Sequence, residues 1–349
     1  MENNPSLIRL AGPGAFPDVP MTHNLERRWL HYAFLSLDNQ MSMVGNITWA
    51  GPDPEMPDTS PQVSSILLMH KQGEGWRSSQ YNALVQSPLW SSFSTKDPST
   101  YSLPNRFEMA AVENSPAVRL DLQRTSRPSA NQSATFAGNQ HFRWQSETGV
   151  KARGVWQFDD QVAKDIQAIG YHERVRGCWD WPDIGGWVHG FASDPAGEEP
   201  DAPPETAVVF TLLFPTDSPD SAKASIIVWR RGRMWRHFPR RNVSVIAYGE
   251  LDPNLVVQVP ELANLLDVPP MPTIPSRLIL NGQLGEDRIL IDFRAETAAR
   301  LIVPNETGIE PYRIYETLGL CRVTATISGT RIAYETRGLV EFTGGAGDL

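Results

Sequence analysis

The sequence has 349 residues, of which 40 % are hydrophobic and 20 % charged, and it carries a formal net charge of −9 with a pI near 5.3. This length fits two domains with apolar cores, and the acidic balance argues against a nucleic-acid partner, which needs a basic face. We expect a cytoplasmic protein, because there is no secretory leader, no apolar segment near the ~20 residues of a membrane span, and only two, distant cysteines.

The first half of the chain is expected to contain short strands separated by polar loops. Residues 118–123 alternate apolar and polar side chains at a period of two, as in a strand with one face toward a core. Residues 51–61 and 126–133 are polar and are expected to be loops.

The second half continues with a strand at residues 206–214, which are almost uniformly apolar and therefore covered on both faces. Residues 216–221 predict a hairpin loop. A basic run at residues 230–241 predicts solvated arginines at a hairpin tip, and contact with an acidic substrate or carrier is the less favoured alternative.

Alternating strands return at residues 288–294 and 322–328. Turn residues at Asn281-Gly282 and at 285–287 are expected to precede the first of them. Ser328-Gly329 predicts a tight hairpin after the second.

Helical patterns are rare. Only residues 261–266 and 295–300 are helix-like, and no repeat at a fixed period is visible. Many short strands with regular turn signals predict an all-β protein made of sandwiches or closed barrels.

The stretch from residue 169 to residue 191 has the most unusual composition. It holds three Trp, one Tyr, two His, two Arg and three carboxylates in 23 residues. This mixture is costly to bury and would expose a large apolar patch on a plain surface. It suits the wall of a binding cavity.

If this stretch is extended, Tyr171, Glu173 and Val175 share one face, and His172 and Arg174 share the other. A Glu in a Trp-lined pocket would have its pKa raised by desolvation and could act as a proton donor. The alternative is a structural Glu–Arg ion pair between two barrels. The catalytic candidates are Glu173, Asp180, His172 and Tyr171.

Aromatic and basic residues near these candidates are expected to contact a substrate. A Trp offers a broad apolar surface and one N–H donor. His189 alternates with aromatic residues on one strand face, where a buried structural histidine is the alternative, and Asp183 beside Pro182 is expected to cap a turn. The substrate-binding candidates are Trp179, Trp181, Trp187, His189, Arg176 and Trp156.

Other chemistries lack support in the sequence. The seven His residues are scattered without zinc-ligand spacing, so no metal site is expected. There is no glycine-rich phosphate loop between a strand and a helix, no nucleophile elbow and no evident activating neighbour for either Cys. After these exclusions, the chemistry that we expect is a cofactor-free reaction of a hydrophobic small molecule.

The chain resembles the two-domain lipocalin-like family of carotenoid hydratases and AttH proteins, whose relatives include fungal Diels–Alderases and, more distantly, tocopherol cyclase. In that family a small residue, Arg and Gly precede Gly-Tyr-His-Asp-His-Asn-Trp-Gly by about fifteen residues. Here 152–154 precede 170–177 in that order. Aromatic residues at 28–32, 179–181 and 187–191 also fit the family pattern.

The end of the chain adds to the resemblance with a Tyr, a Gly and a Val-Glu pair at 334–344, so the likeness spans roughly residues 25–345. It implies two antiparallel barrels packed together, with domains at 23–178 and 179–349 after an N-terminal arm at 1–22. The family's Asp-His-Asn is replaced by Glu173-Arg174-Val175, and its next Trp by Arg176. Glu173 could inherit the acidic role, but these changes argue against carotenoid hydration itself.

Three functions follow as hypotheses. The first is a cofactor-independent cyclase or isomerase of secondary-metabolite biosynthesis, in which an aromatic cavity folds a polyene or polyketide-like chain. The second is a hydratase or lyase with Glu173 or Asp180 as acid and base. The third is a non-catalytic carrier of a lipophilic ligand.

Overall fold

The computed structural model describes thirteen segments of the chain, and it divides the protein into two compact units, Met1–Trp179 and Asp180–Leu349. The expected boundary at 178/179 lies one residue from this division. The expected arm at 1–22 lies outside the described residues. The described segments are 25–51, 62–84, 93–94, 100–103, 105–109, 115–135, 140–159, 162–179, 184–194, 202–215, 223–259, 274–303 and 312–344.

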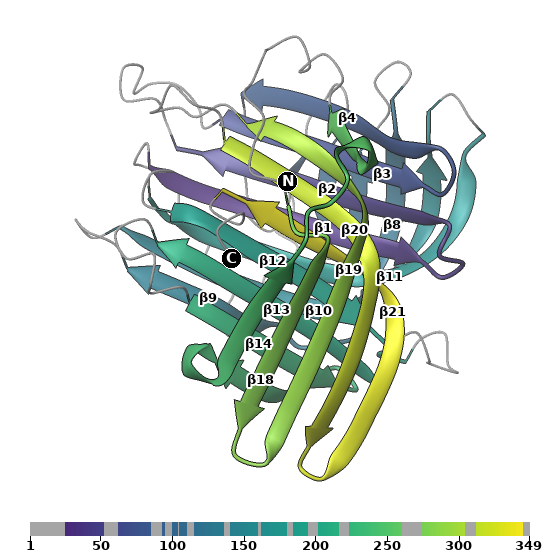
Figure 1. Ribbon diagram of the computed structural model, residues 1–349. Coiled ribbons are helices and arrows are strands. Elements are labelled where there is room, and N and C mark those ends of the chain that lie inside the picture. The colour runs from purple at the N-terminus through teal and green to yellow at the C-terminus, as the bar shows by residue number, and fades with distance from the viewer. Residues whose placement is uncertain are drawn as a thin grey trace. The chain divides into compact units, whose positions relative to one another are not determined.

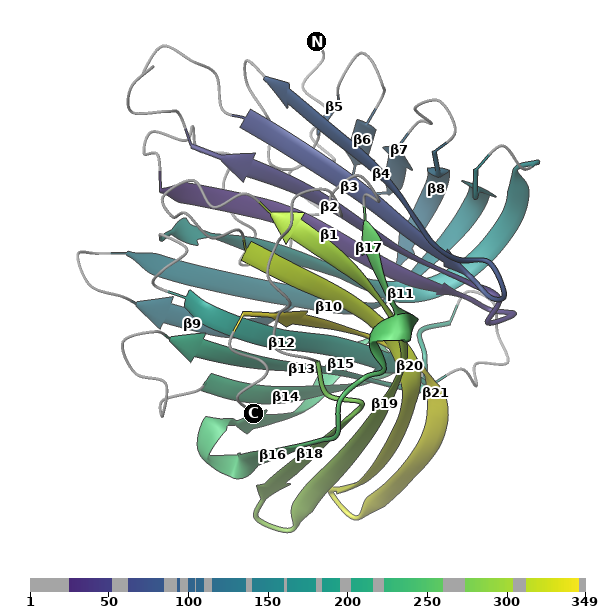
Figure 2. The same cartoon turned by 45° about the horizontal axis from the view of Figure 1, so that its top comes forward.

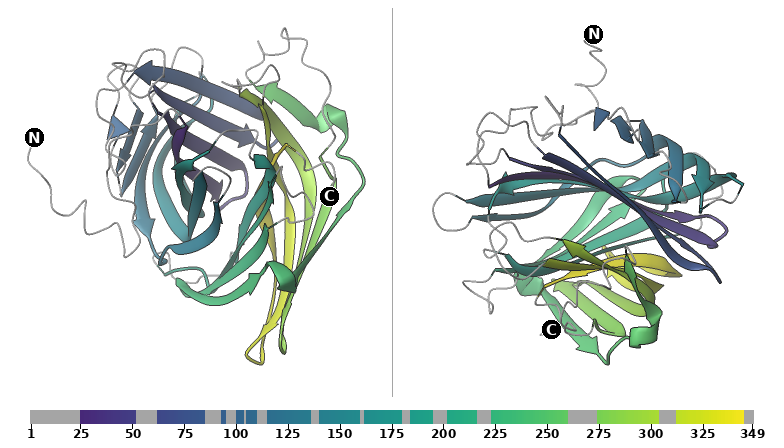
Figure 3. Two further views of the ribbon diagram at one scale, coloured as in Figure 1. Left: turned by 90° about the vertical axis from the view of Figure 1, so that its left-hand side faces the viewer. Right: turned by 90° about the horizontal axis from the view of Figure 1, so that it is seen from above.

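The first unit is an antiparallel sheet that curls on itself, as Figures 1 and 3 show. Its strands follow the order β4-β3-β2-β1-β11-β10-β8-β7-β6-β5, and β9 also pairs with β10. The strands are β1 (Glu26–Ser36), β2 (Met41–Ala50), β3 (Gln62–Lys71), β4 (Gly75–Leu84), β5 (Phe93–Ser94), β6 (Thr100–Leu103), β7 (Arg106–Met109), β8 (Ala117–Arg124), β9 (Ser129–Thr135), β10 (His141–Gln157) and β11 (Lys164–Cys178).

The second unit repeats this plan with the order β15-β14-β13-β12-β21-β20-β19-β18-β16, and β17 pairs in parallel with β19 (Figure 2). Two short 3₁₀ turns, η4 (Arg240–Asn242) and η5 (Pro253–Leu255), connect its strands. The strands are β12 (Ile184–Ser193), β13 (Thr206–Pro215), β14 (Lys223–Arg230), β15 (Arg233–Pro239), β16 (Val243–Tyr248), β17 (Val256–Val259), β18 (Arg277–Leu284), β19 (Asp287–Val303), β20 (Tyr312–Ile327) and β21 (Thr330–Thr343).

Each unit has a face that carries its apolar core, which we call the inner face. In β1, Leu30, Tyr32 and Phe34 belong to the core of the first unit, so the alternate residues Trp29 and His31 lie on the outer face. Both faces are buried along much of β1 and β11. No helix among the described residues has the length and hydropathy of a membrane span.

Several strand predictions are confirmed. Residues 118–123 lie in β8, and 206–214 lie in β13, whose side chains are buried on both faces. Ser328 and Gly329 form the two-residue turn between β20 and β21, and both have the positive φ that such a turn requires. The basic run begins at a hairpin tip, Arg231-Gly232, where Arg231 pairs with Glu205.

Other local predictions are wrong. Residues 295–300 continue β19 as a strand instead of a helix, because they pair with β17 on one side and β20 on the other. Asn281-Gly282 is not a turn but lies inside β18, where Phe238 and Ile289 occupy the space beside Gly282. Part of the polar segment 126–133 forms β9. Residues 52–61, 216–221 and 261–266 lie outside the described residues.

The close approach of β11 to β1 depends on Gly170. A Cβ built at Gly170 would lie 1.8 Å from the carbonyl oxygen of Ala33 on the paired strand. Backbone cannot give way as a flexible side chain can, so a methyl group here would force the two strands apart.

We therefore expect Gly170→Ala to lower the free energy of unfolding by about 2–3 kcal/mol, with a fall of roughly 5–10 °C in the unfolding temperature. Gly73→Asn is the control, because Gly73 has a φ of +81° with no atom nearby, and Asn tolerates that conformation. Thermal unfolding followed by circular dichroism measures both. Equal stability of the Gly170→Ala variant and the wild type would contradict this account of the strand contact.

Candidate functional site

The inner face of the first unit carries a group of polar side chains among its apolar ones. Register places Glu147 of β10 directly opposite His172 of β11, and His172 opposite Tyr32 of β1. Arg174 follows His172 by two residues on the same face, and Arg124 ends the neighbouring strand β8. We call this group the inner polar cluster: Tyr32, Arg124, Glu147, His172 and Arg174.

The two hydrogen bonds of His172 define its protonation. Its Nδ1 lies 3.0 Å from the carbonyl oxygen of His31, which can only accept, so Nδ1 carries the proton. Its Nε2 then accepts from Nε of Arg174 at 3.1 Å. Burial, together with the positive charges of Arg124 and Arg174, holds the pKa of His172 well below its ordinary value. His172 is therefore neutral, and it orients the guanidinium of Arg174.

Glu147 is the buried acid of the cluster. Its side chain is 5 % exposed, and one of its oxygens lies 3.3 Å from an Nη atom of Arg124. Desolvation raises the pKa of Glu147, and the attraction of Arg124 and Arg174 only partly opposes that rise. A carboxyl group in this environment holds its proton to a higher pH than an exposed one, which is the property a general acid needs.

Aromatic side chains lie within the cluster and in the apolar core beside it. The ring of Tyr32 stacks on His172 with centroids 4.2 Å apart. Trp156, a predicted substrate contact, lies further along β10 within the same apolar core. Its Nε1 is buried, and no described residue accepts a hydrogen bond from it. The inner face thus combines apolar surface with a few fixed donors, as small-molecule sites do.

Glu173, the leading acid candidate from the sequence, lies on the opposite, outer face of β11. Its two carboxylate oxygens accept hydrogen bonds from the indole N–H of Trp29 at 3.1 Å and of Trp144 at 2.8 Å. Its side chain is buried, with a relative exposure of 2 %. Arg176 lies on the inner face, two residues beyond Arg174.

The tryptophans beside Glu173 pack against each other. Trp29 meets Trp144 and Trp179 edge-on, with centroids 6.2 Å and 5.6 Å apart, and Phe142 contacts all three indoles. Trp179 is wholly buried in this aromatic cluster. Tyr171 shares the face and lies 5.6 Å from the ring of His31. Among the described residues of this face, aromatic rings pack against each other beside the carboxylate of Glu173.

The second unit repeats the arrangement of the outer face. Trp187 donates its indole N–H to Glu341, and His189 lies directly opposite Glu341 on the paired strand. Trp29 and His31 have the same spacing on β1, and His31 lies opposite Glu173. Nδ1 of His189 lies 2.8 Å from the hydroxyl oxygen of Thr211.

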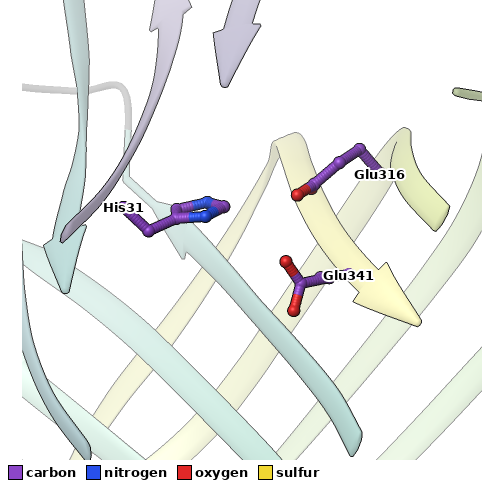
Figure 4. A group of neighbouring side chains, drawn as sticks. All are labelled: His31, Glu316 and Glu341. Atoms are coloured by element: carbon purple, nitrogen blue, oxygen red, sulfur yellow. The ribbon is translucent and has the colours of Figure 1, made fainter. Parts of the chain in front are cut away.

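Figure 4 shows Glu316 beside Glu341, with carboxylate oxygens within 4.8 Å of each other. The two residues are cross-strand partners on β20 and β21. His31, also labelled in Figure 4, belongs to the first unit, where its Nδ1 lies 3.4 Å from the side-chain amide of Asn46.

The predicted site residues thus separate into three groups. His172, Arg176 and Trp156 lie on the inner face of the first unit, whereas Glu173, Tyr171 and Trp179 lie on its outer face. Trp187 and His189 belong to the second unit. Asp180, Trp181 and Asp183 lie outside the described residues. Glu147, Arg124 and Tyr32 were not predicted from the sequence as site residues.

Solved structures with the same fold are known. A proposed AttH protein from Nitrosomonas europaea matches with a TM-score of 0.56 and 14 % identity, over 94 % of this chain and 99 % of its own. Kievitone hydratase from Nectria haematococca matches with a TM-score of 0.57 and 12 % identity, over 97 % and 96 %. CghA, a Diels–Alderase, matches with a TM-score of 0.52 and 10 % identity, over 96 % and 94 %.

No protein-family model and no curated protein matches the sequence. At these identities the likeness establishes the fold, and it confirms the lipocalin-like, all-β architecture that the family resemblance implied. Function has to be argued from the site.

The neutral His172 makes stability depend on pH. Below pH 6.5, its ordinary pKa, the unfolded chain binds a proton that the folded chain does not. Stability should therefore fall as the pH drops below that value, by up to about 1.4 kcal/mol per pH unit. We expect His172→Gln to flatten this fall, measured as the urea midpoint between pH 7.5 and pH 5.5. His141→Gln, a change at an exposed position, should keep the wild-type slope, and an unchanged slope in His172→Gln would refute the assignment.

Because Glu173 accepts hydrogen bonds from two indole N–H groups, we expect the stability effects of changing Glu173 and Trp144 to be strongly coupled. Glu173→Gln keeps the shape but turns an NH₂ group toward one indole N–H, which should cost about 1–3 kcal/mol. Trp144→Phe removes that donor. In a double-mutant cycle, the second change should recover about 1 kcal/mol or more of the loss. Additive effects on urea unfolding would show that the two side chains do not interact.

Proposed function

We propose that the protein is a cofactor-independent cyclase or isomerase, which folds a hydrophobic polyene or polyketide-like molecule against the inner face of the first unit. The observation that carries this proposal is the inner polar cluster. It places a fixed guanidinium, a buried carboxyl with a raised pKa and a neutral imidazole on an otherwise apolar surface.

The chemistry follows from where the donors lie. A substrate carbonyl that accepts from Arg174 or from the carboxyl of Glu147 becomes more electron-poor, which activates a conjugated alkene toward ring closure or double-bond shift. The apolar surroundings strengthen these hydrogen bonds, because water does not compete with them. The curled apolar face would restrict the chain to a reactive conformer and so remove part of the entropic barrier.

A hydratase or lyase is the second candidate, and the raised pKa of Glu147 favours it specifically. A neutral carboxyl can protonate an alkene, and the resulting carboxylate can then take a proton from the attacking water. The same group would run the reverse reaction for elimination. As a hydratase, the protein would use Glu147 as its acid and base instead of Glu173. Both carboxylate oxygens of Glu173 accept hydrogen bonds from indoles on the outer face.

Product mass separates the candidates. The purified protein is incubated with a panel of polyenyl α,β-unsaturated ketones, and the products are analysed by liquid chromatography with mass spectrometry. A cyclase or isomerase gives a new retention time at unchanged mass, whereas a hydratase gives a product heavier by one water. A carrier returns every compound unchanged, which would contradict both catalytic proposals.

Glu147→Gln tests which chemistry operates. The amide keeps a hydrogen-bond donor but cannot transfer a proton, so a cyclase should keep its rate within about tenfold, whereas a hydratase should lose about 10²–10⁴-fold. Glu108→Gln on β7 is the matched control, since Glu108 pairs with Arg106 and Arg119 away from the cluster. Wild-type activity in Glu147→Gln would exclude Glu147 as the proton donor of a hydratase.

A further inference from the structure

Strand β16 lies at one end of the sheet of the second unit, and β18 is its only strand partner among the described residues (Figure 2). In an antiparallel pair, alternate residues direct their N–H and C=O groups away from the partner strand. About half of the backbone groups of β16 therefore point to the outside of the sheet. A row of such groups is a template on which another strand can pair.

The sequence of β16, Val-Ser-Val-Ile-Ala-Tyr, favours such pairing. It contains no charged residue, no Pro and no Gly, and it is rich in the β-branched and aromatic residues that suit strands. On the outer face, Ile246 and Tyr248 are 48 % and 47 % exposed, and Ile246 lies directly opposite Ile279 of β18. The edge thus adjoins apolar surface that a second strand would partly cover.

The opposite end of the same sheet is protected against pairing. There β15 carries Arg233, Arg236 and His237, and it ends with Pro239. Its register with β14 also shifts at Trp229, as at a β-bulge. Charged side chains, proline and bulges are the devices by which proteins keep edge strands from pairing. Because β15 has all three and β16 has none, the two edges of this sheet differ in their ability to accept another strand.

Strand β16 is also held in its extended conformation within one copy of the chain. Just before its start, the side-chain amide of Asn242 donates to the carbonyl oxygen of Gln283 at 2.7 Å. At its end, the hydroxyl of Ser276 donates to the carbonyl oxygen of Tyr248 at 3.0 Å, and the guanidinium of Arg277 lies 5.8 Å from the centre of the Tyr248 ring. A strand fixed in this way loses little conformational entropy when another strand pairs with it.

The residues that flank β16 carry opposite charges at its two ends. Arg240 and Arg241 come shortly before the strand. Glu250 and Asp252 follow it, and all four residues are exposed. Six residues of strand span about 20 Å, which separates the two charged ends within one copy. When two copies of β16 lie antiparallel, the beginning of one strand lies beside the end of the other, so arginines meet carboxylates on both sides of the contact.

We propose that β16 is a self-association edge, on which a second copy of this chain adds its own β16 in antiparallel orientation. A two-fold axis perpendicular to the sheet keeps the outer faces together, and it passes through either Val245 or Ile246. Arg240 then lies opposite Glu250 or Asp252 of the second copy. Each copy has one such edge in this sheet, so the assembly closes at two copies. Self-association at β16 is independent of the chemistry proposed for the inner face of the first unit.

Sedimentation velocity of the full-length protein tests this assembly. Pairing of one short strand is a small contact, so the dissociation constant of the dimer should lie between about 1 and 100 µM. Samples from about 1 to 300 µM should therefore change from monomer to dimer. Hydrogen exchange of residues 243–248 should be slower at the highest concentration than at the lowest, because the outward N–H groups then donate across the contact.

A charge placed on the edge should prevent the pairing. Ile246→Lys brings two positive charges close to the two-fold axis and should raise the dissociation constant about tenfold or more. Leu290→Lys is the matched control, since Leu290 lies on the outer face of β19, is 42 % exposed and is two strands away from the edge. This variant should dimerise as the wild type does.

Exchange of the flanking charges tests the antiparallel orientation. Changing both Arg240 and Arg241 to Glu should raise the dissociation constant about tenfold, because carboxylates then face carboxylates. Adding Glu250→Arg to that double variant should recover part of the loss. Circular dichroism of each variant shows whether a loss of association reflects a loss of fold.

Three results would overturn self-association at β16. A wild-type protein that stays monomeric up to about 300 µM would exclude a second copy as the partner and leave the edge to a strand of a different protein. A dimer that Ile246→Lys does not weaken would form through another surface. Equal exchange of residues 243–248 at both concentrations would likewise show that β16 gains no partner strand.

Discussion

Burial of ionisable groups on an apolar sheet face is the constraint around which the first unit is organised. Glu147 and His172 lose their hydration there, and each such loss costs free energy unless partners on the same face replace the water. Arg124, Arg174 and the backbone of β1 supply those partners. A protein under selection for stability alone would fill these positions with apolar side chains, so the retained polar group favours a function there.

The outer face meets the same constraint in a different way. Glu173 is fixed by two indole donors and enclosed by rings, which leaves a rigid carboxylate in packed surroundings. The second unit uses the same spacing, with Trp187 and His189 on its first strand and Glu341 on its last. This recurrence indicates that the outer-face pattern belongs to the architecture that the two units share.

Much of the fold could be predicted from the sequence, because a period of two and short turn signals are local properties. Strands β8 and β13 and the Ser328-Gly329 turn follow from such patterns. The helix expected at residues 295–300 failed because its strand conformation is imposed by two neighbouring strands far away in the sequence. The alternation also separated His172 from Glu173 correctly, but it could not say which face carries the core. Glu147 could not be predicted, because only the register of β10 and β11 places it opposite His172. The spacing Trp-x-His occurs at residues 29–31 and again at 187–189, and this recurrence in the sequence would have indicated that the two units repeat one strand pattern.

The central claim is that a hydrophobic ligand lies on the inner face of the first unit in contact with Glu147, His172 and Arg174. A crystal structure of the protein soaked with a conjugated polyenone measures this most directly. The account predicts density for the ligand along the core of the first unit, with its carbonyl oxygen within hydrogen-bonding distance of Arg174 or Glu147. Density confined to another part of the molecule, with the inner polar cluster untouched, would contradict it.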